Sequence, residues 1–418
     1  MGRDTVISPS IHQKFRREEV APANQRWLFG RVLVRKWYRP CAGHYGGSYV
    51  TLLSPRALLT RLIAFDTTSH RSNLELIAFA ANLLADRGWQ CVMTSDASGE
   101  KQNLFASLGP RVDGGLVLSG HSDVVPAMSS GWESDPFTLR EADERFYGRG
   151  TCDMKGFIAT VLYAGQSLAA SALKRPLHIA LSYDEEVGCL GVPRLLETLD
   201  PHYPTPRHAV IGEPTMLQAM GDHKGILRAR ACVHGKAAHS SLPELGSSAI
   251  SAGAGAVASF YRWLPEASSR YSGLSGNIGL IKGGTAGNII ADLCTFSCEL
   301  RYRGEVNVEE LLGELQRVIA PAQLDELLCA AGLTREGNEE LLERVLRLAA
   351  HPEIGSVPYM TEAGLFQRSG MQAVVCGPGN IAQAHQSNEY ISLTQFSAGL
   401  AMVEHLIAGQ CRERAGER

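Results

Sequence analysis

No run of 18 consecutive apolar residues occurs in the sequence, so we expect no helix that spans a membrane. The net charge of -3 gives no electrostatic basis for binding nucleic acid. The ten cysteines are scattered and form no C-x-x-C pair, which favours a reduced cytoplasmic protein over a disulfide scaffold. Internal repeats and low-complexity tracts are also missing. A composition of 44% hydrophobic and 20% charged residues is instead typical of a soluble globular protein.

The first 49 residues differ from the rest of the chain. They carry basic side chains and few acids, such as Asp4, Glu18 and Glu19, and show no helical or strand period. A secretory signal needs an apolar segment that this stretch does not contain. We therefore expect a flexible basic extension, with an organelle transit peptide as the alternative, and a cytoplasmic location for the folded part.

From Ser54 onward, helical and strand patterns alternate. Ser54-Pro55 begins the first helix, and Gly88 ends the second. The further elements are strands at 90–94, 103–108 and 115–120, a helix at 155–170, a strand at 177–183, a helix at 190–198 and a strand at 208–212. This alternation predicts an α/β fold with a mainly parallel sheet covered by helices.

The pattern changes near residue 224. A strand at 226–234, a helix at 247–264, strands at 276–282 and 289–302 and a helix at 307–320 form most of a ferredoxin-like α+β unit. The α/β pattern returns with a helix at 362–369, a strand at 373–376 and a helix at 392–408. Between Gly304 and Pro358 the sequence is acid-rich and mostly helical, and we find no convincing fourth strand for the unit.

The 418 residues suit more than one domain, or one large domain with an insertion. We expect an N-terminal extension at 1–49, a main domain at 50–223 that resumes at 334–418, and a second domain inserted at 224–333.

The stretch 116–126 is the centre of the functional argument. The apolar run Leu116–Leu118 is followed closely by His121 and Asp123. Residues two apart share a face at a strand end, so the two side chains can point into one site. A metal-bound histidine usually donates its other ring N–H to such a carboxylate, although a turn with two polar residues would give the same sequence.

Four further groups of polar residues follow predicted strands or Gly-rich turns. Asp153 opens a helix, Asp184–Glu186 and Glu213 follow apolar strands, and His385 follows a Gly-Pro-Gly loop. Taken singly, they fit a helix N-cap, a solvated acidic face, a turn residue and an ordinary histidine. Taken together, two histidines and three carboxylates are the ligand set of a two-metal hydrolase, and such ligands suit Zn²⁺.

These motifs resemble the acetylornithine deacetylase and succinyl-diaminopimelate desuccinylase family, within the aminoacylase and carboxypeptidase group of co-catalytic metallohydrolases. The resemblance covers about residues 52–409. It rests on the ordered set Ser119–Pro126, Gly148–Gly156, Asp184–Glu186 and Gly212–Thr215. The segments Ser182–Cys189, Thr361–Phe366 and Gly377–His385 look most like acetylornithine deacetylases. The resemblance implies a zinc-peptidase-like fold with an inserted lid and dimerisation domain.

The resemblance also implies the roles of the metal ligands. His121, Asp153 and Glu213 would hold one divalent ion, and Asp153, Glu186 and His385 the other, with Asp153 bridging. The ions would be Zn²⁺, with Co²⁺ as an alternative.

The resemblance gives three further features of this site. Glu185 would be the general base, Asp123 would orient His121, and the Asp153–Met154 peptide bond would be cis.

In the inserted domain, the resemblance points to residues that bind the substrate. His239 would reach the site of the partner subunit in a homodimer formed through the lid. Asn288 and Arg301 would bind the substrate carboxylate, since the guanidinium fork suits carboxylates. Near the second part of the catalytic domain, Thr361 and Glu362 would line the pocket, with Glu362 facing the substrate ammonium.

The implied reaction is hydrolysis of N2-acetyl-L-ornithine to L-ornithine and acetate, a step of arginine biosynthesis. Desuccinylation of N-succinyl-diaminopimelate, or deacylation of another N-acyl amino acid, is the alternative within the family. A non-catalytic binding protein on the same fold is the alternative outside it, but no ligand of the set is missing. We expect a small-molecule substrate and neither nucleic acid nor membrane as partner.

Overall fold

The computed structural model describes residues 36–37, 52–127, 130–197, 199, 204–304 and 306–412. The expected flexible extension at 1–49 lies outside these residues except for Lys36–Trp37. These two residues form strand β1, which pairs antiparallel with β2. None of the helices in the described part of the chain has the length and apolar character needed to cross a membrane.

A nine-stranded sheet has the order β1-β2-β3-β7-β4-β8-β15-β9-β14. Its strands after β1 are β2 Gln90–Ser95, β3 Gln102–Leu108, β4 Leu116–His121, β7 Leu177–Ser182, β8 His208–Pro214, β9 Met220–His223, β14 Gly355–Val357 and β15 Gln372–Gly377. The four central strands β7, β4, β8 and β15 run parallel to one another, whereas β2 and β3 pair antiparallel. The predicted α/β fold with a helix-covered, mainly parallel sheet is confirmed.

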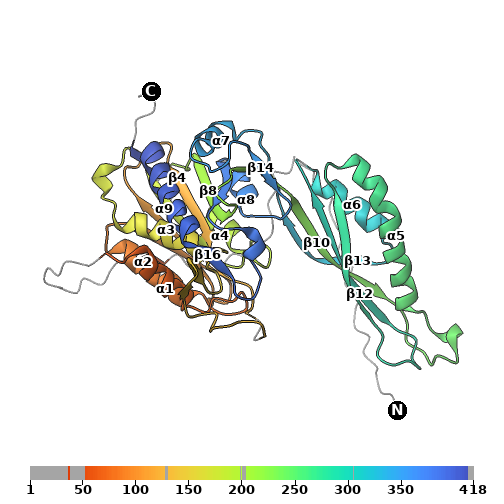
Figure 1. The fold of residues 1–418 in the computed structure, drawn as a ribbon. Helices are drawn as coiled ribbons and strands as arrows, with labels where there is room; N and C mark the ends of the chain where they lie inside the picture. Colours follow the sequence, from red (N-terminus) through yellow and green to blue (C-terminus); the bar gives the residue numbers. More distant parts are fainter. Residues whose placement is uncertain are drawn as a thin grey trace, which may run out of the picture. The chain divides into compact units, whose positions relative to one another are not determined.

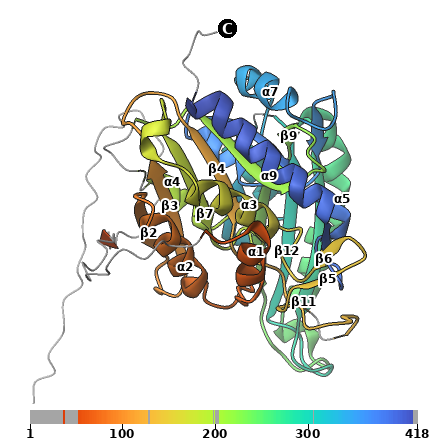
Figure 2. The same ribbon diagram turned by 60° about the vertical axis from the view of Figure 1, so that its left-hand side comes forward.

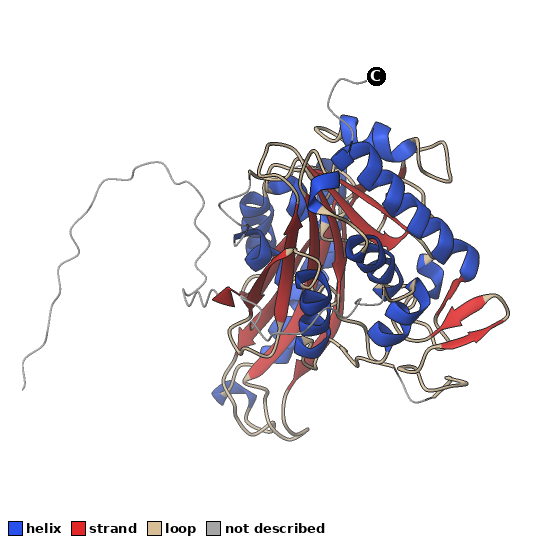
Figure 3. Cartoon of the chain, turned by 90° about the vertical axis from the view of Figure 1, so that its left-hand side faces the viewer, coloured by secondary structure: helices blue, strands red, loops and turns tan. Residues whose placement is uncertain are grey.

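Helices cover both faces of this sheet, and Figure 3 shows the strands as a layer between them. The helices are α1 Pro55–Ile63, α2 Leu74–Ala85, α3 Lys155–Gln166, α4 Gly191–Glu197, α7 Glu339–Leu346, α8 Ala363–Arg368 and α9 Leu393–Ile407. Alternation along β4 explains the two layers. Leu116 and Leu118 join the core with α1, α2, α3 and α9, and Val117 joins the core with α4 and α8. Figure 2 shows α1, α2, α3 and α9 on one side of the sheet.

Local sequence sets the ends of several helices. The Ser54 hydroxyl accepts a hydrogen bond from the Ala57 N–H, and Pro55 occupies the first turn of α1. The Ser392 hydroxyl does the same for α9 by accepting from the Gln395 N–H. Gly88, just beyond α2, has φ of 85°, the left-handed conformation that glycine adopts without strain.

A second, four-stranded sheet has the order β11-β12-β10-β13 and is antiparallel. Its elements are β10 Gly225–His234, α5 Ala249–Arg270, β11 Ser275–Gly283, β12 Leu293–Tyr302, α6 Val308–Val318 and β13 Gln323–Ala330. Helices α5 and α6 lie on one face of this sheet and share a hydrophobic core with it (Figure 1).

Strand β13 corrects the expectation that no fourth strand exists. β13 is an edge strand whose residues are mostly half-buried or exposed, and they show no alternation of apolar and polar residues. Asp325 and Glu326 in this strand pair with Arg230 of β10. Leu324, Leu327 and Leu328 lie at helical spacing, so this stretch resembles a helix in sequence.

A third sheet, of order β16-β6-β5, joins distant parts of the chain near the site. It consists of β5 Arg140–Ala142, β6 Arg145–Tyr147 and β16 Tyr390–Ser392. Tyr390 pairs with Tyr147, so the segment after His385 lies beside the Gly-rich segment that carries Asp153.

Candidate active site

The carboxyl ends of three adjacent parallel strands place most of the polar residues. His121 ends β4, Asp184–Glu186 follow β7, and Glu213 lies near the end of β8. His121 is in register with Ser182 of β7. In α/β sheets, ligands bind outside the carboxyl ends of the strands, and this is the position of the candidate site.

The first ligand group is His121, Asp153 and Glu213, each of which offers one atom within 4.8 Å of the others. The His121 Nε2 atom lies 2.9 Å from Asp153 Oδ1 and 3.8 Å from Glu213 Oε1. All three side chains are buried, and Glu213 Oε1 has no hydrogen-bond partner among the described residues. A buried carboxylate oxygen without a partner is costly, so the group fits a bound cation.

The second ligand group is Asp153, Glu186 and His385, and it shares Asp153 with the first. The His385 Nε2 atom lies 3.0 Å from Glu186 Oε2 and 3.6 Å from Asp153 Oδ2. One carboxylate common to two groups of nitrogen and oxygen donors is the arrangement of a two-metal site.

The peptide backbone around these ligands is unusual. The Asp153–Met154 peptide bond is cis, as the resemblance implied. Gly212 directly precedes Glu213, and a Cβ atom at this position would lie 2.1 Å from the ring of Phe157. Only glycine therefore lets α3 pack against β8 beside the ligand.

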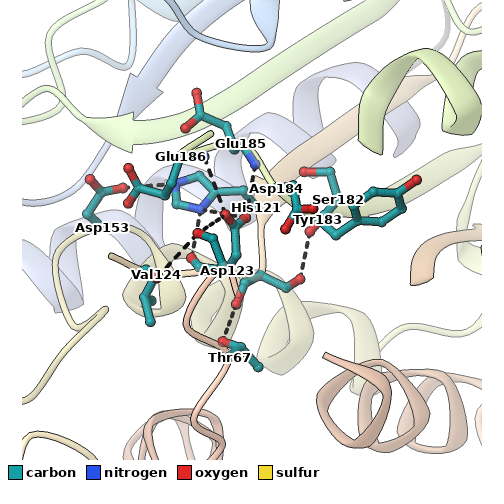
Figure 4. A network of polar contacts seen from close by, with 12 residues as sticks. Thr67, His121, Asp123, Val124, Asp153, Ser182, Tyr183, Asp184, Glu185 and Glu186 are labelled. Carbon is teal, nitrogen blue, oxygen red and sulfur yellow. Dashed lines mark hydrogen bonds and ion pairs between the residues drawn. The ribbon is translucent and has the colours of Figure 1, made fainter. Parts of the chain in front are cut away.

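Asp123 holds the loop after β7 as well as contacting His121 (Figure 4). The His121 Nδ1 atom lies 3.0 Å from the Asp123 backbone oxygen and 3.6 Å from its Oδ1. The Asp123 carboxylate accepts hydrogen bonds from the backbone N–H groups of Glu185 and Glu186, at 3.1 and 3.3 Å, and from the Ser69 hydroxyl at 2.9 Å. One buried carboxylate thus connects the histidine to both acids of the loop.

The charges of the site favour a cation. Burial raises the pKa of Glu213 well above its usual range, and the charge of Asp153 raises it further. Hydrogen bonds to Asp153 and Glu186 raise the pKa of His385 to about 10. The protein groups around these carboxylates therefore supply too little positive charge to balance them. His385 keeps a proton that a metal ion would displace.

Glu185, which directly precedes the ligand Glu186, belongs to neither ligand group. Burial raises the pKa of Glu185 well above its usual range; His121 opposes this shift, and the charge of Glu186 adds to it. The Cys189 thiol donates a weak hydrogen bond to Glu185 Oε1 at 3.5 Å. A carboxylate with a raised pKa beside metal ligands is suited to accept a proton and return it.

The structure shows which groups bind the Glu362 carboxylate. This side chain is fully buried, and its two carboxylate oxygens accept hydrogen bonds from the hydroxyls of Ser119 and Ser182. Thr361 is also fully buried, and its hydroxyl accepts from the Ala363 N–H. Glu362 thus links β4 and β7 to the start of α8. The sequence showed an acid at a helix start but not the two serines that bind it.

The predicted residues of the inserted unit bond to neighbours within that unit. No hydrogen bond or ion pair within the described residues joins His239, Asn288 or Arg301 to the five ligands. His239 is exposed, and its Nδ1 atom lies 2.7 Å from the Ser241 hydroxyl. Arg301 donates through Nε to Glu299 at 2.7 Å, and Glu299 also accepts from Arg228.

Sequence reasoning missed Glu389, which contacts the segment that carries Asp153. Its carboxylate is buried and accepts hydrogen bonds from the backbone N–H groups of Cys152 and Asp153. The only signal was its position four residues after His385, because a single acid in a loop belongs to no periodic pattern.

Comparisons with known proteins agree with this geometry. Residues 117–409 match the model of peptidase family M20/M25/M40. An acetylornithine deacetylase of Myxococcus xanthus is 36% identical over 386 residues, which are 87% of this chain and 99% of that protein. An acetylornithine deacetylase of Shigella sonnei is 35% identical over 361 residues, 82% of this chain and 92% of that protein.

Solved structures share the fold at low sequence identity. An M20 metallo-carboxypeptidase of Sulfolobus solfataricus has a TM-score of 0.67 at 16% identity, with 84% of this chain and 98% of that chain covered. A dinuclear metal-binding M20 peptidase of Bacillus subtilis has a TM-score of 0.55 at 16% identity, with 85% and 99% covered.

One conclusion follows from the ligand groups, the family match and the relatives that align with most of the chain. The molecule is a metal-binding hydrolase that acts on an amide bond. By sequence, fold and site, the chain belongs to peptidase family M20/M25/M40.

Proposed function

We propose that this enzyme hydrolyses N2-acetyl-L-ornithine to L-ornithine and acetate, a step of arginine biosynthesis. The observation that carries the proposal is the pair of ligand groups that share Asp153, with Glu185 beside them. The substrate is proposed from the two relatives named acetylornithine deacetylase, which are 36% and 35% identical to this chain.

Two divalent ions, Zn²⁺ or alternatively Co²⁺, would occupy the two ligand groups. His121 and Glu213 would hold one ion, and Glu186 and His385 would hold the other. Asp153 would be a ligand of both ions. When bound, the ions supply Lewis-acid activation of a water molecule and of the acyl carbonyl. Glu213 Oε1, which has no hydrogen-bond partner among the described residues, and the mixed histidine and carboxylate donors fit this use.

Glu185 is the general base in this proposal. Its carboxylate takes a proton from the attacking water and later gives it to the leaving α-amine, so the proton count balances. Asp123 accepts hydrogen bonds from the backbone of Glu185 and Glu186 and also contacts His121. These contacts fix the position of the general base relative to the metal ligands. In the proposed homodimer, His239 of one subunit donates to the carbonyl oxygen of the substrate bound in the other subunit, as negative charge develops there.

Arg301 binds the substrate carboxylate, and Asn288 lies in the loop that contributes to the same contact. The Glu299 carboxylate holds the Arg301 Nε atom, which fixes the direction of the guanidinium. Glu362 is buried and its carboxylate is bound by two serines. We therefore propose that the substrate ammonium binds a different partner.

The enzyme is proposed to act as a homodimer formed through an inserted lid domain at 224–333, between catalytic parts at 50–223 and 334–418. Strand β11 is an edge of the four-stranded sheet and leaves Leu280 and Ile281 61% and 52% exposed. An edge strand with apolar side chains is suited to pair with a second copy. Sedimentation should give a dimer, and a Leu280→Lys, Ile281→Glu variant should give a monomer.

A cytoplasmic location completes the proposal. All nine cysteines of the described residues have free thiols, a pattern that is typical of a reducing compartment.

A panel of N-acyl amino acids tests the substrate. The purified protein, loaded with Zn²⁺ or Co²⁺, is assayed with N2-acetyl-L-ornithine, N-acetyl-L-methionine and N-succinyl-diaminopimelate, and the Glu185→Gln protein serves as the control for contaminating activity. The proposal predicts the highest kcat/KM on acetylornithine. Higher activity on the succinyl substrate would favour the desuccinylase alternative, and no turnover of any amide would favour a binding protein.

A further inference from the structure

Glu389 collects four hydrogen bonds from a single segment of the chain. Its Oε1 atom accepts from the backbone N–H groups of Cys152 and Asp153, at 2.9 and 3.0 Å. Its Oε2 atom accepts from the Gly150 N–H at 3.0 Å and from the Arg149 guanidinium at 2.7 Å. The side chain is 1% exposed, so these bonds replace its hydration almost completely.

The same glutamate belongs to the segment that carries His385. It directly precedes β16, which pairs with β6 through Tyr390 and Tyr147, and its backbone oxygen accepts from the Gly148 N–H at 3.0 Å. The two segments are distant in sequence and each supplies one ligand of the second group, Asp153 or His385. Glu389 is therefore bonded to one ligand segment while being part of the other.

We propose that Glu389 is a positioning residue that holds the Asp153 segment against the His385 segment and so assembles the two-ion site. The proposal rests on the metal ligands proposed above and adds a residue outside the ligand set. The backbone N–H of Asp153 itself is one of the four donors, so the contact acts directly on the shared ligand.

The chemistry of the contact requires a carboxylate. Four donors converge on two oxygens, and the Arg149 guanidinium balances the buried charge. A glutamine of the same shape keeps one oxygen for Cys152 and Asp153 but places an NH₂ group opposite Gly150 and Arg149. Donors would then face donors, and the segment would have to move away. Outer partners of metal ligands typically change metal affinity by about 10- to 100-fold when replaced.

The test is a metal titration of the metal-free Glu389→Gln protein with Co²⁺ at pH 7.5, by calorimetry and by counting bound ions after dialysis. We expect at least one of the two ions to bind about 10- to 100-fold more weakly than in the wild type. The Glu340→Gln protein is the matched control, because Glu340 on α7 also pairs with arginines, namely Arg207 and Arg344. It should bind both ions with wild-type affinity.

Thermal unfolding of the metal-free proteins separates positioning from a merely structural role. If Glu389→Gln lowers the melting temperature but leaves both affinities unchanged, the inference is overturned. If the wild type itself takes up fewer than two ions, the proposed metal pair fails, and the inference fails with it. A Glu389→Ala variant, which lacks both side-chain acceptors, should bind the ions no more tightly than Glu389→Gln, and tighter binding would also contradict the inference.

Discussion

His223 gives the fold a specific sensitivity to acid. This histidine ends β9 and is fully buried. Its Nε2 atom accepts a hydrogen bond from the Gly364 N–H at 3.1 Å, and its Nδ1 atom lies 3.0 Å from the Lys224 backbone oxygen. Accepting at one nitrogen while donating at the other requires the neutral imidazole. Burial is the main cause that lowers the pKa of His223 to about 4.

The sign and size of the effect follow from this pKa. In the unfolded chain, a histidine titrates near pH 6.5, so between about pH 6.5 and 4 only the unfolded state takes up the proton. Stability therefore falls as the pH falls through this window. At pH 5 the difference of about 1.5 pH units, at about 1.36 kcal/mol each, lowers the free energy of unfolding by about 2 kcal/mol.

Urea unfolding of the metal-free protein at pH 7.5 and pH 5, followed by tryptophan fluorescence, measures this loss. His223→Gln removes the titrating group, so the wild type should lose about 2 kcal/mol more than this variant between the two pH values. Other titrating groups are common to both proteins and cancel in the comparison.

The exposed His405 of α9 provides the control, and His405→Gln should follow the wild type. If His223→Gln also lost stability in parallel with the wild type, the imidazole would not be held neutral and the reasoning would be refuted.

Other predictions concern the site. Glu185→Gln should still bind two ions but lower kcat by about 10²-fold or more, as for a positioned general base; unchanged kcat would reject that role. His121→Ala and His385→Ala should each lose metal and most activity, as shown by metal counting and acetate release. Because hydrogen bonds raise the pKa of His385 to about 10, ion uptake should release a proton and metal affinity should rise with pH from about 6 to 8; an affinity independent of pH would contradict this. Glu362→Gln should change kcat/KM on acetylornithine and on N-acetyl-methionine by the same factor, and a loss confined to acetylornithine would restore a role in binding the ammonium.

The sequence predicted those parts of the molecule that depend on local periodicity. Apolar runs such as Leu116–Leu118 form strands buried on both faces, and the polar residues after them converge at the carboxyl edge of the sheet. The groups His121, Asp153, Glu213 and Asp153, Glu186, His385 lie together in the structure as the resemblance implied.

Features that depend on tertiary partners were not predictable. Strand β13 lies at a sheet edge and carries two acids, and the pairing of Asp325 with Arg230 appears only when β10 lies beside it. The sequence predicted that Glu362 faces the substrate. It could not show the two serines that bind Glu362, because they lie 243 and 180 residues away along the chain. Glu389 binds backbone N–H groups, which leave no trace in a side-chain pattern.

The most direct test of the account is a crystal structure of the protein grown with Zn²⁺, with anomalous scattering recorded at the zinc edge. The account predicts two anomalous peaks about 3.5–4 Å apart on either side of the Asp153 carboxylate. One peak should lie beside His121 and Glu213, and the other beside Glu186 and His385. A single peak, or peaks away from these side chains, would contradict the two-metal site on which the proposed deacetylase activity depends.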